Sequence, residues 1–155
     1  MFIGEKGGLS MPSHQGKWVL FDTNIYISAI REGTESDTYE ELLNSLPHTY
    51  LSSVVSGELY AGCIDDISLK LVKQFTERFE KTGRVVTPTH QNWNQAGLVL
   101  AKINKRQPKY KSKSSQLFRD VLIATSTNQI GATLYTKDIE DFRVIRKYIN
   151  FSLNS

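Results

Sequence analysis

The chain has 155 residues, of which 39% are hydrophobic and 23% charged, and its formal net charge is +3. This composition is typical of a soluble globular protein with one domain and excludes a mostly disordered chain. A single cysteine excludes an internal disulfide, and the three histidines lie far apart without the spacing of a zinc site. No apolar run approaches the roughly 20 residues that span a bilayer, so we expect a cytoplasmic protein with no membrane contact.

Charge is distributed unevenly along the chain. Between positions 20 and 66, nine acidic residues stand against one basic residue, whereas positions 81–119 hold nine basic residues and no acidic one. This division indicates a polyanionic partner on the basic side of the molecule. A solvated basic helix with an adjoining loop would give the same pattern, so charge alone leaves both interpretations open.

The first half of the chain opens with residues 1–16, whose Gly, Ser and Pro content predicts a flexible leader before one domain over 17–155. Met11 is an alternative start within this leader. The apolar run over 18–21 predicts a strand buried on both faces, and the capping residues after it introduce a helix. The elements expected up to position 81 are helices over 25–30, 36–46, about 53–64 and 67–81, and a strand over 49–52.

The second half continues the alternation of strands and helices. The expected elements are strands over 84–88, 132–136 and 148–153, helices over 90–106 and 116–130, and a basic flexible loop over 107–115. Gly131 ends the second of these helices, as a C-terminal glycine does. The alternation predicts an α/β fold with a mostly parallel central sheet and helices on both faces.

Four acidic residues are placed where chemistry is expected. Asp22 directly follows the first strand and Asp138 follows the strand over 132–136, and ligands gather at the carboxyl ends of parallel strands. Glu58 and Asp120 fall on the apolar faces of their helices, where an unpaired carboxylate is costly. Each acid alone has an ordinary explanation as a helix cap, a turn residue or one half of an ion pair. The four together predict a shared acidic site.

Carboxylates that crowd one spot raise at least one pKa unless a cation enters. Hard oxygen ligands select Mg²⁺ or Mn²⁺ over zinc, and such an ion keeps waters, one of which can attack a phosphate. Other mechanisms find no support: Cys63 has no nearby histidine, and the sequence contains neither a G-x-S-x-G motif nor a glycine-rich phosphate loop. Metal-dependent phosphodiester chemistry is therefore favoured.

Four segments resemble the PIN-domain nucleases, and most closely the toxin subunits of bacterial VapBC-type toxin–antitoxin pairs. They occur in the order of that family and at similar separations, over roughly residues 17 to the C-terminus. The segments are VLFDTNIYI (19–27), SSVVSGELYAG (52–62), FRDVLIATS (118–126) and LYTKDIEDF (134–142). The leader before the first strand is longer than is usual for such toxins.

The resemblance implies a PIN-like three-layer sandwich and a metal-dependent endoribonuclease. Position by position, it places the catalytic and metal-binding quartet on Asp22, Glu58, Asp120 and Asp138, with one or two Mg²⁺ or Mn²⁺ ions. Asn24 and Thr136 match supporting residues. Many relatives have Asn at the place of Asp138 and an acid three residues later, so Asp141 is a reserve ligand. The family further implies a homodimer and an antitoxin that inserts a peptide near the acidic pocket.

The basic stretch is expected to hold the RNA backbone, with an aromatic ring available for stacking on an unpaired base. The candidates for RNA contact are Lys105, Arg106, Lys109, Tyr110, Lys111, Lys113 and Arg119. Arg119 stands where relatives commonly have a small or polar residue. We expect it to pair with an acid of the quartet rather than to contact phosphate.

Three other functions fit parts of the pattern. A PIN-domain nuclease could process RNA outside a toxin–antitoxin pair, and a PIN fold could serve as a non-catalytic scaffold. A haloacid-dehalogenase-like phosphatase would use the aspartate after the first strand as its nucleophile. That family requires a second aspartate where this chain has Asn24, which makes it the remotest alternative.

Overall fold

The computed structural model describes residues 17–154, so the predicted leader over 1–16, with the alternative start at Met11, lies outside the described residues. Within this range the elements alternate between strands and helices along the chain, as the sequence predicts. None of the described helices combines the length and the apolar character that a membrane span requires.

Five strands form one sheet in the order β3-β2-β1-β4-β5, and every neighbouring pair is parallel. The central strand β1 is fully buried, as its continuous apolar sequence predicts. The strands are β1 (Val19–Phe21), β2 (Thr49–Ser52), β3 (Val85–Val86), β4 (Thr133–Tyr135) and β5 (Ser152–Leu153).

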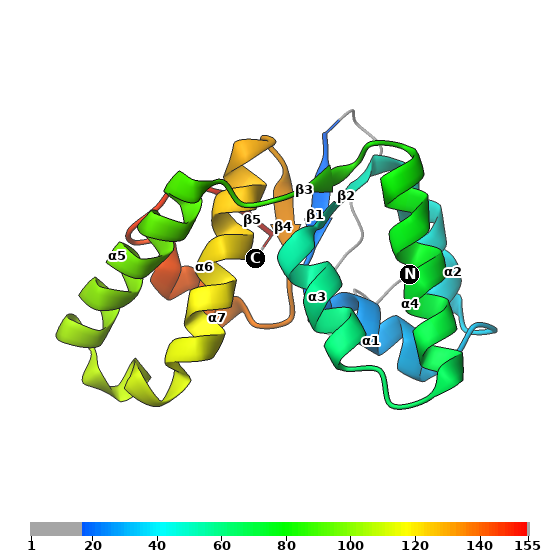
Figure 1. The fold of residues 1–155 in the computed structure, drawn as a ribbon, viewed down its shortest axis with the longest axis horizontal. Coiled ribbons are helices and arrows are strands. Elements are labelled where there is room, and N and C mark those ends of the chain that lie inside the picture. Colours follow the sequence, from blue (N-terminus) through cyan, green and yellow to red (C-terminus); the bar gives the residue numbers. More distant parts are fainter. Residues whose placement is uncertain (1–16, 155) are drawn as a thin grey trace.

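Helices cover both faces of this sheet. Figure 1 shows α5, α6 and α7 on one side of the strands and α1, α2 and α4 on the other, which confirms the expected three layers. The α-helices are α1 (Thr23–Glu32), α2 (Asp37–Ser45), α3 (Ser53–Ala61), α4 (Asp66–Lys81), α5 (His90–Arg106), α6 (Ser114–Gln129) and α7 (Ile139–Ile145). Two 3₁₀ helices, η2 (Leu46–His48) and η3 (Pro108–Lys113), complete the described elements.

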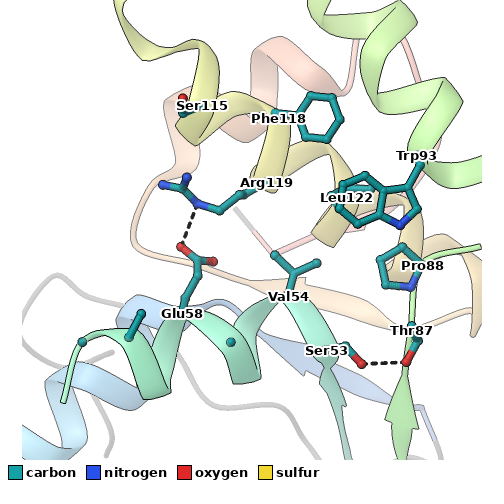
Figure 2. A pocket seen from close by; sticks show the side chains of 13 residues that line it. Ser53, Val54, Glu58, Thr87, Pro88, Trp93, Ser115, Phe118, Arg119 and Leu122 are labelled. Carbon is teal, nitrogen blue, oxygen red and sulfur yellow. Dashed lines mark hydrogen bonds and ion pairs between the residues drawn. The ribbon is translucent and has the colours of Figure 1, made fainter.

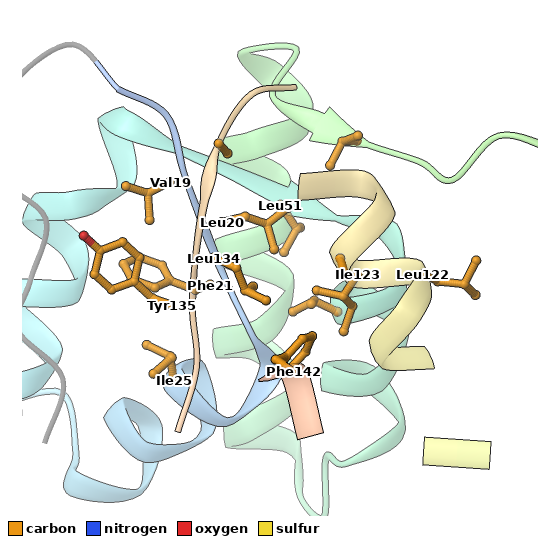
Figure 3. Close-up of a cluster of buried hydrophobic side chains, with 14 of the residues drawn as sticks. Val19, Leu20, Phe21, Ile25, Leu51, Leu122, Ile123, Leu134, Tyr135 and Phe142 are labelled. Carbon is orange, nitrogen blue, oxygen red and sulfur yellow. The ribbon is translucent and has the colours of Figure 1, made fainter. Parts of the chain in front are cut away.

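The hydrophobic core fixes the strands against the helices that carry acidic residues. Leu20 and Leu134 from the two central strands lie close to Ile123 of α6 and Phe142 of α7, as Figure 3 shows, and all four are fully buried. Burying one such side chain stabilises the fold by roughly 1.5–3 kcal/mol. Because α6 and α7 pack on the strands through these contacts, the C-terminal ends of β1 and β4 are held at a fixed distance from both helices.

Several boundaries differ from the sequence-based expectation. The basic segment over 107–115 is not an open loop, because η3 occupies most of it and α6 already begins at Ser114. The last strand is much shorter than 148–153, since only Ser152 and Leu153 pair with β4. Ile149 and Phe151 are nevertheless buried, and this burial rather than strand pairing accounts for the apolar signal.

Candidate active site

Asp22 lies at the C-terminal end of β1 and is the N-cap of α1. Its Oδ1 accepts the Thr23 backbone N–H at 2.8 Å, and its Oδ2 accepts the Thr136 hydroxyl at 2.7 Å. Asn24 Nδ2 donates to the same Oδ2 across 3.3 Å. Asp22 is 6% exposed, and three hydrogen bonds hold its carboxylate in one orientation at the edge of the sheet.

Thr136 and Asn24 connect the ends of β1 and β4. The Thr136 hydroxyl donates to Asp22 and accepts the backbone N–H of Asp138 at 2.9 Å. Asn24 Oδ1 accepts the backbone N–H of Lys137 at 3.2 Å, while its amide group faces Asp22. The two residues expected to support the quartet therefore fix the positions of Asp22 and Asp138 relative to each other.

Glu58 projects from α3 toward the same edge. Its Oε1 accepts the Thr23 hydroxyl at 3.1 Å, and its Oε2 accepts Arg119 Nε at 3.2 Å. Thr23 thereby bridges two acids, because its backbone N–H binds Asp22 while its hydroxyl binds Glu58. The ion pair agrees with the expectation that Arg119 pairs with an acid of the quartet.

Asp120 is the most deeply buried of the four predicted acids, with 1% of its surface exposed on α6. Its Oδ1 accepts Gln116 Nε2 at 2.9 Å, one helical turn earlier. Its Oδ2 is buried and has no hydrogen-bond partner. A buried carboxylate oxygen without a partner is unfavourable, so this atom requires a proton or a cation.

Asp138 and Asp141 complete the site from the beginning of α7. One carboxylate oxygen from each of Asp120, Asp138 and Asp141 lies within 4.8 Å of the other two. Asp141 is 3% exposed and accepts Lys113 Nζ at 2.7 Å. The reserve ligand thus converges with two acids of the predicted quartet, Asp120 and Asp138, and is paired with Lys113. Among the described residues, neither Asp22 nor Glu58 belongs to such a converging group.

Burial and mutual repulsion raise the pKa values of three acids of the site. Burial, with smaller contributions from Glu58 and Asp138, raises the pKa of Asp22 to about 6 despite its hydrogen bonds. Burial and the neighbouring charge of Asp22 raise the pKa of Asp120 to about 8, and burial followed by the charge of Asp141 raises the pKa of Asp138. The charged carboxylates therefore repel one another, in addition to the cost of their burial.

The donor set fits a hard divalent cation. The possible metal ligands that converge here among the described residues are carboxylate oxygens, which favour Mg²⁺ or Mn²⁺ over softer metals. The unpartnered Oδ2 of Asp120 is the strongest sign of the fit, because a bound cation would remove the cost of leaving this atom buried and alone.

An apolar groove of about 910 Å³ opens beside the acids, between α3, α6 and the segment that leads into α5. Figure 2 shows the Glu58–Arg119 ion pair at one end and Trp93 with Pro88 at the other. Val54 and Phe118 face the space between them. The indole of Trp93 is tilted against Phe118 with ring centroids 5.7 Å apart, yet 49% of Trp93 is exposed.

The predicted RNA-contact residues occupy two kinds of position. Arg119 and Lys113 are engaged in ion pairs at the acidic site. Arg106 lies over the ring of Tyr148, and Lys109 lies over that of Tyr110, which is half-buried against the core. Both of these cationic side chains are exposed, as are Lys105 and Lys111, so four basic residues remain available on the surface beside η3.

Two residues of the site were not identified from the sequence. Thr23 bridges Asp22 and Glu58, and Gln116 donates to Asp120 while its Oε1 accepts Arg119 Nη2 at 2.8 Å. Gln116 could have been found from its spacing, because it stands three and four residues before Arg119 and Asp120 on one helix. Thr23 could not, since its contact with Glu58 spans 35 positions.

The fold and its acidic edge define the class of protein. The PIN domain family model matches residues 19–148, so the chain belongs to the PIN domain family. The resemblance read from the sequence is thereby confirmed at the level of the family. No curated protein matches the chain.

Solved structures with the same fold include protein–DNA assemblies. DNA-bound VapBC from Salmonella typhimurium has a TM-score of 0.58 and 18% identity, with 88% of this chain and 96% of that chain covered. VapBC2 from Rickettsia felis, bound to a DNA fragment from its promoter, has a TM-score of 0.55 and 19% identity, with 87% and 96% covered. FitAcB from Neisseria gonorrhoeae has a TM-score of 0.54 and 20% identity, with 88% and 96% covered. At these identities the similarity shows a shared fold.

Proposed function

We propose that the protein is a metal-dependent endoribonuclease that hydrolyses RNA phosphodiester bonds. Membership of the PIN domain family supports nuclease chemistry. The observation that carries the proposal is the set of converging carboxylates around the buried, unpartnered Oδ2 of Asp120. A purely structural role does not explain why a fold would keep such an uncompensated group.

Each residue of the site has a defined task in this proposal. Asp22, Asp120 and Asp138 would hold Mg²⁺ or Mn²⁺, and Glu58 would complete the acidic quartet. Thr136 and Asn24 fix the carboxylate of Asp22, so its oxygens need not reorganise when substrate arrives. A bound Mg²⁺ or Mn²⁺ would lower the pKa of a water and stabilise negative charge on the phosphate oxygens.

The experiment that tests this proposal is cleavage of a labelled structured RNA by the purified protein. We expect products with Mg²⁺ or Mn²⁺ and none with EDTA, and cleavage should return when the metal is added in excess. Cleavage that continues undiminished in EDTA would contradict the metal dependence. An absence of cleavage with either metal, on several RNAs, would favour a non-catalytic PIN module.

The exposed lysines beside η3 are proposed to bind the RNA backbone. Charge reversal in Lys109→Glu/Lys111→Glu should weaken RNA binding and flatten its dependence on salt. Each lost phosphate contact should lower the slope of log K against log salt by roughly 0.7 for single strands. Fluorescence anisotropy at several salt concentrations measures both quantities.

The matched control reverses two exposed lysines on α4, in Lys70→Glu/Lys73→Glu. This variant has the same change in net charge, but its lysines belong to α4, which lies on the other side of the sheet from α5 and α6, the helices that η3 connects. Its salt slope should stay closer to that of the unmodified protein. An equal change in both variants would assign the effect to net charge and remove the proposed RNA surface.

The further part of the proposal is that the nuclease is the toxin of a type II pair whose antitoxin binds the apolar groove. The solved neighbours include VapBC and FitAB bound to DNA, which supports a protein partner of this kind. The groove is apolar along its length and ends at the Glu58–Arg119 pair, so a segment lying in it would reach the acids. A homodimer and a cytoplasmic location stay predictions.

Trp93 is the residue of the groove whose loss should affect this complex most. Exposed aromatic residues are frequent hot spots of protein–protein interfaces. The candidate antitoxin is the protein encoded by the adjacent gene, and Trp93→Ala should weaken its binding by at least about 30-fold. Trp18→Ala is the control, because Trp18 is also partly exposed but does not line the groove. Equal affinity of both variants, measured by calorimetry, would exclude the groove as the docking site.

The toxin role has its own test in cells. Expression of the chain should arrest growth, and co-expression of the neighbouring open reading frame should relieve the arrest. Growth arrest that the neighbour does not relieve would favour an RNA-processing nuclease outside such a pair. Normal growth together with RNA cleavage in vitro would favour the same alternative.

A further inference from the structure

Lys113 makes a contact at the acidic site that the proposed chemistry does not use. Its Nζ lies 2.7 Å from Asp141 Oδ2, and the side chain of Asp141 is 4% exposed whereas that of Lys113 is 46% exposed. Lys113 ends η3 immediately before α6, which carries Asp120 two turns further on. The ammonium group is therefore at the rim of the cluster that Asp141 forms with Asp120 and Asp138.

Positive charge is shared unequally among the five carboxylates of this edge. Arg119 pairs with Glu58 and Lys113 pairs with Asp141. Within residues 17–154, Asp22, Asp120 and Asp138 form no ion pair. Asp120 also keeps its buried Oδ2 without a hydrogen-bond partner. Lys113 also attracts the charges of Asp138 and Asp120 without forming an ion pair with either. Negative charge is thus least compensated on these two carboxylates and on Asp22.

We propose that Lys113 is a built-in counter-ion that keeps Asp141 out of the coordination of the metal, so that Asp120 and Asp138 of the converging group hold one divalent ion together with the neighbouring Asp22. The inference rests on the proposed function, because it concerns the metal site of that nuclease. Lys113 is then a positioning residue rather than an RNA contact. Asp138 is a metal ligand, whereas Asp141 is the partner of the lysine.

Two physical effects support this role. The charge-assisted hydrogen bond at 2.7 Å is short, and the lysine is tethered beside Asp141 at a high effective concentration, so it competes well against a dissolved ion. A second divalent cation next to Asp141 would also lie close to the ammonium charge, and like charges at a few ångströms repel strongly in a partly buried site. The lysine therefore excludes a second ion.

The test measures Mn²⁺ binding rather than activity, by titration calorimetry and by counting bound Mn²⁺ with electron paramagnetic resonance. The native chain should bind one ion. Lys113→Met keeps the aliphatic stem but removes the charge, so its affinity for Mn²⁺ should rise at least about tenfold. Lys113→Arg keeps the charge and should bind Mn²⁺ within threefold of the native chain.

A second pair of variants separates ligation from charge and guards against poor folding of Lys113→Met. Lys113→Met/Asp141→Asn conserves the net charge of the site and should keep the native Kd within about threefold, because Asp141 is not a ligand. Asp138→Asn should weaken Mn²⁺ binding at least about 100-fold. Loss of binding in the double variant, or an unchanged Kd in Lys113→Met, would overturn the proposal.

The outcomes also distinguish this inference from the proposed function. If the native chain binds no Mn²⁺ while Lys113→Met does, the proposed metal-dependent nuclease fails but the role of the lysine stands. If both bind with the same Kd, the nuclease proposal stands and the lysine has no such role. If neither protein binds Mn²⁺, both proposals are wrong.

Discussion

Replacing Asp22 by Asn should lower the rate of RNA cleavage by at least about 100-fold while leaving the fold intact. Changes in the outer partners of metal ligands already cost 10–100-fold, so the loss of a ligand's own charge should cost at least as much. Asn is as good an N-cap as Asp, and its Oδ1 can still accept the Thr23 N–H. The variant therefore changes the chemistry of the site without removing the start of α1.

Single-turnover cleavage of a labelled RNA with saturating Mg²⁺ or Mn²⁺ is the measurement, and Asp66→Asn is its control. Asp66 also stands at the start of a helix, α4, but is exposed and far along the chain from the acidic edge. Its substitution should leave the rate unchanged. If Asp22→Asn keeps full activity, Asp22 has no role in holding the metal and does not belong to the catalytic quartet.

The acidic edge could be located from the sequence because simple rules of parallel sheets place it. An apolar run followed by a capping aspartate puts Asp22 at the end of a buried strand, and Asp138 follows the next strand in the sheet. The C-terminal ends of adjacent parallel strands meet at one edge. Glu58 and Asp120 were placed by helical spacing alone. In the structure Asp120 is buried as expected, whereas the side chain of Glu58 is 21% exposed. Their catalytic roles stay predictions.

The cations of the site could not be placed in the same way. Lys113 reaches Asp141 across 28 positions and Arg119 reaches Glu58 across 61, so both contacts depend on how α6 packs against α7 and α3. A basic stretch with no acidic residue is typical of a nucleic-acid surface. The pattern gives no sign that one of its lysines, Lys113, pairs with a buried carboxylate. Lys113, the last residue of η3, is exposed like most of this helix, yet its ammonium group pairs with the buried carboxylate of Asp141.

Replacing Asp120 by Asn should stabilise the metal-free protein, with a gain that grows with pH. Burial raises the pKa of Asp120 to about 8, well above its usual value of 3.8. Between these values the folded state keeps a proton that the unfolded state has released, so the free energy of unfolding falls as pH rises. Above about pH 8 the folded chain carries the full cost of a buried charge, which Asn avoids. The expected gain there is about 2–5 kcal/mol.

Thermal unfolding in EDTA at pH 6 to 9 measures this gain, which corresponds to a rise in Tm of roughly 5–15 °C at the upper end of that range. Asp141→Asn is the matched control, because Asp141 is buried to a similar degree but is already neutralised by Lys113 and should show no such gain. Excess Mn²⁺ should raise the Tm of the native chain and not that of Asp120→Asn, since only the native site binds the ion. If Asp120→Asn is no more stable than the native chain anywhere in this pH range, the buried carboxylate carries no penalty and Asp120 Oδ2 needs no cation.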